Sequence, residues 1–223
     1  MKEVAAMGMD GDGVAVVTGA SGEIAAAIVD RLRADGFRVA GLDDGGAAHV
    51  DLSIAVDVTD LGATTEAVGR VTSELGAIAV LVTAPSAYGA APFGEMERDA
   101  WRRLLDEHLG GTANACRAVM PGMVAAGRGT VVTLSSWLAV AGIPGEAYMA
   151  AATGSLFGFT KSLALEVVRD GIRVNGIAVG PLTADPPAMG VRPEEVAATV
   201  SFLVADGDHL VGQILNAAAG AVV

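Results

Sequence analysis

The chain has 223 residues, of which 52% are hydrophobic, a share that excludes an intrinsically disordered protein and suffices for one large core. Its formal net charge of −12 argues against nucleic acid as a partner, because an acidic surface repels phosphates. The single cysteine, Cys116, and the wide spacing of the three histidines exclude a disulfide framework and indicate no metal site.

The sequence shows neither an apolar run of membrane-spanning length nor the pattern of a signal peptide. No apolar run approaches the roughly 18 residues that a membrane span needs. The first 13 residues carry Asp10 and Asp12 where a signal peptide would be apolar. We therefore expect a cytoplasmic protein without a membrane partner.

Short apolar runs alternate along the chain with longer runs of helical periodicity. The predicted strands are 14–17, 37–42, 54–56, 79–83, 130–134, 173–178 and 212–216. The predicted helices are 24–33, 61–75, 98–126, 148–169 and 193–205, with Gly110-Gly111 as a point that could shorten the third. This alternation predicts an α/β fold, a doubly wound Rossmann-type sheet of about seven parallel strands with about six helices on its two faces. No linker divides the chain, so we expect residues 1–223 to form a single domain.

The turn after the first strand has the composition of a phosphate-binding loop. Gly19 and Gly22 allow a tight turn, and Ser21 and Ile24 lie where the first helix presents its N–H groups. A plain strand-to-helix turn is the alternative interpretation.

Two acidic residues strengthen the interpretation as a dinucleotide site. Asp43 ends the second strand about 20 residues further on, where a carboxylate accepts hydrogen bonds from the adenosine ribose and repels a 2′-phosphate. This favours NAD over NADP, unless Asp43 is an ordinary loop acid. Asp57, followed by Val58, is placed to reach the adenine edge, or alternatively to cap the helix that begins near Leu61.

An ordered set of motifs resembles the short-chain dehydrogenase/reductase family over essentially the whole chain, and within it most closely the acyl-carrier-protein ketoreductase type. The motifs are Thr18-Gly19-Ala20-Ser21, Asp57-Val58-Thr59-Asp60, Leu134-Ser135-Ser136, Thr160-Lys161-Ser162-Leu163-Ala164-Leu165-Glu166, Gly171-Ile172-Arg173-Val174-Asn175 and Arg192-Pro193-Glu194-Glu195-Val196-Ala197. The resemblance implies hydride transfer between a nicotinamide and the carbonyl or alcohol carbon of a small-molecule substrate. It also implies a tyrosine that carries the proton, a lysine four residues later, a serine that binds the substrate oxygen and a supporting asparagine.

The residues at those positions depart from the family pattern. Ser136 keeps the serine position, although it could simply end its strand. The tyrosine position is Met149 and the lysine position is Thr153, while a one-residue deletion would restore Tyr148 without a lysine. His108 takes the asparagine position, as a proton carrier or as a structural histidine.

The cofactor positions are altered as well. Ala84 and its neighbours replace the family's Asn-Asn-Ala-Gly after the fourth strand, and Glu23 replaces a glycine of the phosphate turn. Only 12 residues separate Gly180 from Pro193, which implies a shorter cover over the substrate.

Three functions remain open on these residues. The first is an NAD(H)-dependent oxidoreductase, acting on a carbonyl or alcohol or on an acyl thioester, with His108 or Tyr148 as a rearranged proton carrier. The second is a non-catalytic subunit paired with a competent relative, and the third is non-redox chemistry such as cyclisation or elimination on the same scaffold. The helix at 148–169 is apolar nearly all round, which predicts either a homo- or hetero-oligomer interface or an intramolecular cover.

Overall fold

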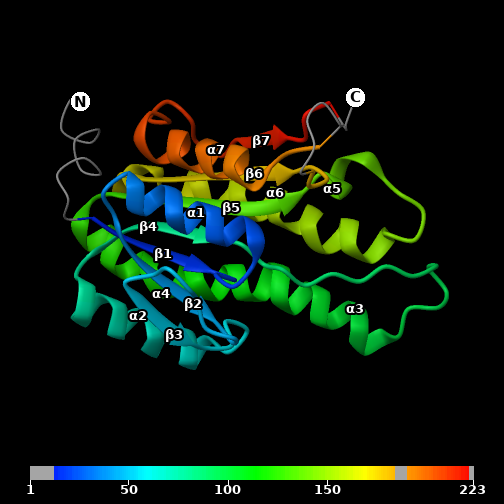
Figure 1. Cartoon of the computed structure of the whole chain (residues 1–223), viewed down its shortest axis with the longest axis horizontal. Coiled ribbons are helices and arrows are strands. Elements are labelled where there is room, and N and C mark those ends of the chain that lie inside the picture. Colours follow the sequence, from blue (N-terminus) through cyan, green and yellow to red (C-terminus); the bar gives the residue numbers. More distant parts are fainter. Residues whose placement is uncertain (1–12, 184–189, 221–223) are drawn as a thin grey trace.

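A twisted parallel sheet forms the centre of the computed structural model, which describes residues 13–183 and 190–220 (Figure 1). The strands are β1 Val14–Thr18, β2 Arg38–Asp43, β3 Leu52–Ala55, β4 Ile78–Thr83, β5 Gly129–Ser136, β6 Ile172–Val179 and β7 Ile214–Ala217. Their order is β3-β2-β1-β4-β5-β6-β7, and every pairing is parallel. The prediction of a doubly wound sheet of seven parallel strands is confirmed. Because the order reverses between β1 and β4, a crevice opens at their carboxyl ends.

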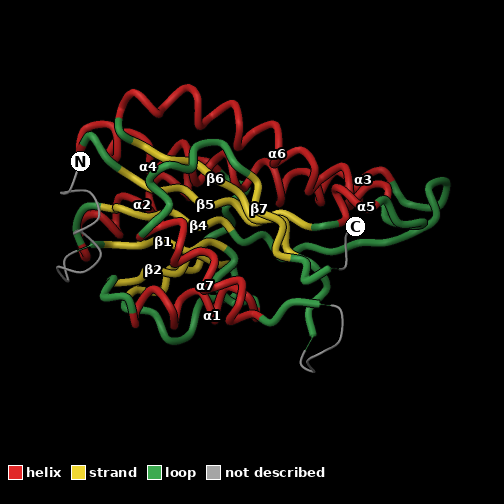
Figure 2. Tube along the Cα trace, turned by 90° about the horizontal axis from the view of Figure 1, so that it is seen from above, coloured by secondary structure: helices red, strands yellow, loops and turns green. Residues whose placement is uncertain are grey.

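Helices cover both faces of this sheet (Figure 2). One face carries α1 Glu23–Ala34 and α7 Pro193–Ala205, and the other carries α2 Leu61–Leu75, α4 Thr112–Ala126 and α6 Ala147–Val167. All five residues of β1 are buried, which explains why they read as a continuous apolar run instead of an alternating one. The core is accordingly two apolar layers, one on each side of the strands.

The long helix predicted at 98–126 is present, but its middle has a different winding. It consists of α3 Arg98–Leu105, a π-helical segment at Asp106–Gly111, and α4. The two glycines at 110 and 111 therefore do not shorten the helix. Instead, Gly111 allows close approach to the β3–α2 loop, since a Cβ added there would lie 2.9 Å from Cγ2 of Val58. Short π segments occur frequently at functional sites, and this one carries His108.

The remaining elements lie close to their predicted bounds. The helix α7 begins with Pro193 in its first turn, as expected, and the Arg192 N–H donates to Glu195 Oε2 at 2.9 Å. One short helix, α5 Leu138–Ala141, is not predicted by the sequence pattern. Within the described ranges, no helix is both long and apolar enough to cross a membrane.

Candidate functional site

Three adjoining cavities lie at the carboxyl ends of the strands. The first has a volume of about 330 Å³ and the second about 360 Å³, and both are lined by Gly19, Pro85 and Ser86. The third, of about 280 Å³, shares Ser86, Ala87 and Tyr88 with the second. The cavities thus meet along the segment that follows β4.

Gly19 forms the floor where the first two cavities meet. Its φ is +63°, and a Cβ on it would lie only 2.0 Å from the carbonyl oxygen of Ala84. Its N–H donates to the carbonyl of Leu42 at 3.0 Å, so the turn lies against both β2 and the end of β4. Only glycine satisfies both the positive φ and this close approach.

The first turn of α1 presents its N–H groups to the second cavity. The helix begins after Gly22, which has no side chain to cap it, and residues 22–25 line the cavity. The first N–H groups of a helix have no partners within the helix, and they carry the positive end of its dipole. Glu23 brings one carboxylate to the same place.

Asp43 lines the first cavity and also holds the turn in place. Its Oδ2 accepts from the Ser21 N–H at 3.1 Å and from the Ser21 hydroxyl at 2.9 Å, and its Oδ1 accepts from the Gly45 N–H at 3.0 Å. An ionised carboxylate has about four acceptor positions, so one remains for a ligand hydroxyl.

The β3–α2 loop forms another wall of the first cavity. Asp57 Oδ1 accepts from the N–H and the hydroxyl of Thr59 at 2.8 and 2.7 Å. The Asn114 amide of α4 donates to the carbonyls of Val58 and Thr59 at 3.0 and 2.8 Å and fixes the loop from behind. The alternative that Asp57 caps α2 is wrong, because the cap is Asp60, which accepts from the Ala63 N–H at 3.0 Å.

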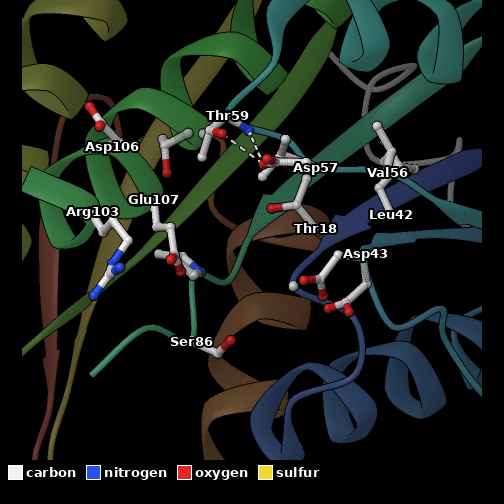
Figure 3. A pocket seen from close by; sticks show the side chains of 16 residues that line it. Thr18, Leu42, Asp43, Val56, Asp57, Thr59, Ser86, Arg103, Asp106 and Glu107 are labelled. Carbon is white, nitrogen blue, oxygen red and sulfur yellow. Dashed lines mark hydrogen bonds between the residues drawn. The ribbon is translucent and has the colours of Figure 1, made fainter. Parts of the chain in front are cut away.

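Acidic side chains line the first cavity from two directions (Figure 3). Asp43 and Asp57 come from the strand ends, and Glu107 with Arg103 lies across from them on the long helix. Partial burial, and then the charges of Asp57 and Asp44, raise the pKa of Glu107 above its ordinary value, against a weaker effect of Arg103. Sequence reasoning missed Arg103 and Glu107, although their four-residue spacing puts them on one helix face.

The second cavity brings together the residues that the sequence predicts for the reactive positions. Ser136, Met149, Thr153 and His108 all line it. Ser136 ends β5, and its Oγ accepts from the Leu138 N–H at 3.2 Å, which leaves its own hydrogen free for donation. Thr153 donates its hydroxyl to the Met149 carbonyl at 2.8 Å within α6, so that hydroxyl is already used.

His108 has one ring nitrogen bonded and the other without a partner. Nε2 lies 2.9 Å from the carbonyl oxygen of Ala87 and must donate to it, because a carbonyl only accepts. Nδ1 then carries a lone pair, is buried, and has no hydrogen-bond partner among the described residues. Burial lowers the pKa of this imidazole, only partly opposed by the Ala87 hydrogen bond, so it is a neutral base at pH 7.

Tyr148 does not reach this cavity. Its hydroxyl donates to the carbonyl of Phe93 at 3.1 Å, and its ring stacks between Phe93 and Trp101 at 5.4 and 6.0 Å. It fixes the β4–α3 loop to α6. Among the residues predicted for catalysis, Ser136 and His108 are therefore brought together and Tyr148 is not.

A different tyrosine borders the second and third cavities. Tyr88 donates its hydroxyl to Oε1 of Glu146, which precedes α6. That hydrogen bond and the negative charge of Glu146 contribute to a pKa of Tyr88 above its ordinary value, so the phenol stays protonated. Oε2 of Glu146 is buried without a partner in the described part of the chain. Neither residue belongs to a motif, so no sequence signal pointed to this pair.

The predicted cofactor residues line the first two cavities, with one exception. Asp43, Asp57 and Val58 line the first, Gly22, Ile24 and Ala84 line the second, and Gly19 lines both. Ser21 is the exception, since it contacts Asp43 without lining either cavity. These residues fit a nicotinamide dinucleotide, because the α1 N-terminus suits a pyrophosphate and the Gly19 turn leaves room that any Cβ would fill.

The comparisons with known proteins agree with this geometry. Residues 13–192 match the family described as short chain dehydrogenase. A cis-4-hydroxycyclohexanecarboxylate dehydrogenase of Sinomonas cyclohexanicum is 35% identical, over 91% of this chain and 93% of that protein. A (2S)-[(R)-hydroxy(phenyl)methyl]succinyl-CoA dehydrogenase subunit, BbsC, of Thauera aromatica is 31% identical over 93% of each chain.

A ketoreductase is also similar. The 3-oxoacyl-[acyl-carrier-protein] reductase FabG of Salmonella typhimurium is 28% identical over 93% of this chain and 96% of that protein. The sheet order, the Gly19 turn and the family match together place the protein among oxidoreductases that generally use NAD(H) or NADP(H). The chain belongs to the short-chain dehydrogenase/reductase family.

Proposed function

We propose that this protein is an NAD(H)-dependent dehydrogenase in which His108 takes the proton of a secondary alcohol. The observation that carries the proposal is that His108 lines the same cavity as Ser136 and the start of α1, while its buried Nδ1 has no hydrogen-bond partner among the described residues. A buried polar atom without a partner is rare in folded proteins, and a ligand hydroxyl would supply the missing hydrogen bond.

The residues divide the work of alcohol oxidation as follows. Bound NAD⁺ supplies the acceptor for the hydride that leaves the alcohol carbon. Ser136 donates its free hydrogen to the substrate oxygen and orients it. His108 Nδ1 accepts the hydroxyl proton as the C=O double bond forms, and Ala87 holds the imidazole in the tautomer that can do so.

The charge of the site supports NAD(H) over NADP(H) and the direction of oxidation. Among the described residues, five carboxylates line the first cavity, from Asp43, Asp44, Asp57, Asp106 and Glu107, against one cation, Arg103. A 2′-phosphate beside Asp43 is disfavoured by this field. NAD⁺ is less negative than NADH, so the same field favours the oxidised cofactor.

A His108→Gln variant tests the proposal. Glutamine can still donate to the Ala87 carbonyl but cannot take a proton, so kcat for alcohol oxidation with NAD⁺ should fall about 10²-fold with little change in KM. In the unchanged protein, the rate should fall only below pH 6.5, because the pKa of His108 is lowered from that value, and this acid limb should vanish in the variant.

Tyr148→Phe is the matched control, since its hydroxyl bonds to Phe93 outside the cavity, and it should leave kcat unchanged. Titration of NADH and NADPH by fluorescence measures the cofactor preference directly. A His108→Gln protein that folds, binds NADH and turns over normally would contradict the assignment.

A second candidate function, a non-catalytic partner subunit, is favoured by a specific observation. Met149 and Thr153 line the reactive cavity without a group that could transfer a proton. Val124 on α4 and Leu165 and Val168 at the end of α6 expose apolar surface that a second subunit would cover, and one relative is named as a subunit. Sedimentation of the purified chain, alone and with a competent relative, distinguishes a self-sufficient dimer from an obligate partner.

A further inference from the structure

The walls of the second cavity and its rim carry almost no charge. Among its described lining residues the one ionised side chain is Glu23, at the end nearest α1, and neither lysine nor arginine is present. The side chains near Ser136 are apolar or uncharged, and they include Met149, Leu134 and Val179. Among the described residues of this cavity, an anionic group of a substrate would therefore find no counter-ion beside Ser136.

The rim extends this apolar character outward. Tyr88 is 67% exposed and Leu182 is 43% exposed, and both line the cavity. The segments that follow β4 and β5 extend beyond the same edge of the sheet (Figure 1). Exposed apolar side chains lie on them, Phe93 in the β4–α3 loop, Val140 on α5 and Ile143 between α5 and α6. An exposed apolar surface beside a cavity indicates a binding site for apolar groups.

The rim is also held in position before any ligand binds. Besides the His108 and Tyr148 contacts, the Ala91 N–H donates to the Gly145 carbonyl at 3.0 Å, and Tyr88 is hydrogen-bonded to Glu146. These contacts join the β4–α3 loop to the segment before α6. A preformed apolar wall costs less ordering entropy on binding.

The charged residues that line the three cavities make the electrostatic field around the site negative. Arg103 is the one cation among the described residues that line any of the three cavities, and it lies between the first and third beside Glu107. Acidic side chains outnumber it six to one, once Glu23 is added to the five carboxylates of the first cavity. This negative field repels a second anion in addition to the cofactor.

We infer that the substrate of this site is an uncharged apolar secondary alcohol, or its ketone, and not a carboxylate or an acyl thioester of an anionic carrier. The inference rests on the proposed function for turnover, but not for binding. It sets this chain apart from the relatives above, whose names specify a carboxylate, a succinyl-CoA derivative or an acyl carrier protein.

The test uses two ligands, 4-methylcyclohexanone and 4-oxocyclohexanecarboxylate, which differ in one substituent, a methyl group in the first and a carboxylate in the second. Binding is measured on the full chain by ligand-observed NMR at low salt, with and without NADH, so it does not depend on catalysis. The uncharged ketone should bind at least tenfold more tightly. Oxidation of 4-methylcyclohexanol should exceed that of 4-hydroxycyclohexanecarboxylate by a similar factor in kcat/KM.

A charge variant tests the cause of the preference. Leu182→Lys adds a cation to the rim and should improve carboxylate binding several-fold, whereas Phe202→Lys, exposed on α7 and outside the three cavities, should not. Equal or tighter binding of the carboxylate by the unchanged protein, or binding of neither ketone, overturns the inference. Selective ketone binding without any alcohol oxidation supports this inference while the proposed function fails.

Discussion

The first and second cavities differ in whether their polar groups already have partners. In the first, the carboxylates of Asp43 and Asp57 hold backbone N–H groups of the turns around them. In the second, His108 Nδ1 has no hydrogen-bond partner among the described residues, and the Ser136 hydroxyl accepts one bond while its own hydrogen can be donated to a ligand. Most acceptor positions of these two carboxylates in the first cavity are therefore used to hold its turns, with one of Asp43 left for a ligand hydroxyl, whereas in the second cavity His108 and Ser136 keep the positions that the proposed chemistry needs.

The Gly19 turn and the residues of the second cavity also differ in how they tolerate amino-acid substitution. The turn at Gly19 depends on backbone geometry that one methyl group would destroy. In the second cavity, Met149 and Thr153 line the wall at the positions that the sequence predicts for the family's acid–base pair. We therefore predict that substitution at the Gly19 turn has a larger effect on folding than substitution of Met149 or Thr153.

The largest effect is expected from Gly19→Ala. The added Cβ would overlap the Ala84 carbonyl oxygen, and the φ of +63° is strained for alanine, so the free energy of unfolding should fall by about 2–4 kcal/mol. NADH binding should be lost with the turn. Gly22→Ala is the control, because its Cβ would meet the Gly19 carbonyl oxygen at 3.4 Å and the Ser86 Cβ at 4.0 Å without overlap, and it should cost about 1 kcal/mol or less. Denaturant titration and NADH fluorescence measure both, and equal effects of the two variants would argue against a special role for the Gly19 turn.

The second-largest effect is expected from substitutions in the second cavity alone. Met149→Tyr with Thr153→Lys should raise ketone reduction about 10²-fold, since a phenol then supplies the proton and a cation lowers its pKa. Both side chains line the second cavity, which gives the larger groups room to extend. Adding Ser136→Ala should abolish the gain. A double variant that binds NADH but gains no activity would show that these two positions do not face the reacting carbon.

The sequence predicts the sheet well because each strand and helix has its own local apolar pattern. The bounds of α2 and α7 agree with the prediction at both ends. The π segment is not predicted, because apolar periodicity does not distinguish it from the α-helices on either side; it brings Gly111 close to Val58, which is distant in the sequence. The short α5 has only four residues, fewer than any periodicity needs.

The location of a residue beside a cavity could be predicted where the residue ends a strand, and not where it depends on a helix face. Asp43 and Ser136 follow from the rule that parallel strands end at one edge. Tyr148 points away from Met149 because consecutive helical residues differ by roughly 100°. Tyr88 and Glu146 are 58 residues apart, so only the fold brings them together.

A smaller effect is expected from Asp43→Ala at the binding end. Removing this carboxylate takes away the repulsion of a 2′-phosphate and frees the Ser21 N–H, so the preference for NADH over NADPH should narrow about tenfold. Asp30→Ala, which removes the same charge from an exposed position on α1 outside the cavities, should not alter the ratio. The two dissociation constants, measured by fluorescence at one ionic strength, give the result. An unchanged ratio in the Asp43 variant would mean that the cofactor ribose lies elsewhere.

The smallest effect is expected from Glu107→Gln, which tests how the negative charge of the first cavity affects cofactor binding. Removing one carboxylate from the first cavity should strengthen NADH binding two- to threefold at pH 7.5, and the gain should shrink in high salt because the charges are screened over about 10 Å at 0.1 M.

The same variant has a signature in stability against pH. The pKa of Glu107 is raised in the fold, so the unfolded chain loses this proton first as the pH rises. As the pH rises above 4.5 and through the raised pKa of the folded state, the free energy of unfolding of the unchanged protein should fall relative to that of Glu107→Gln. Below pH 4.5 Glu107 is protonated in both the folded and the unfolded chain, so the difference should vanish. Glu66→Gln on α2 is the control, since this residue is exposed and lines none of the three cavities. If both glutamine variants shift NADH affinity and the pH profile equally, the effect reflects the net charge of the chain and not the field inside the first cavity.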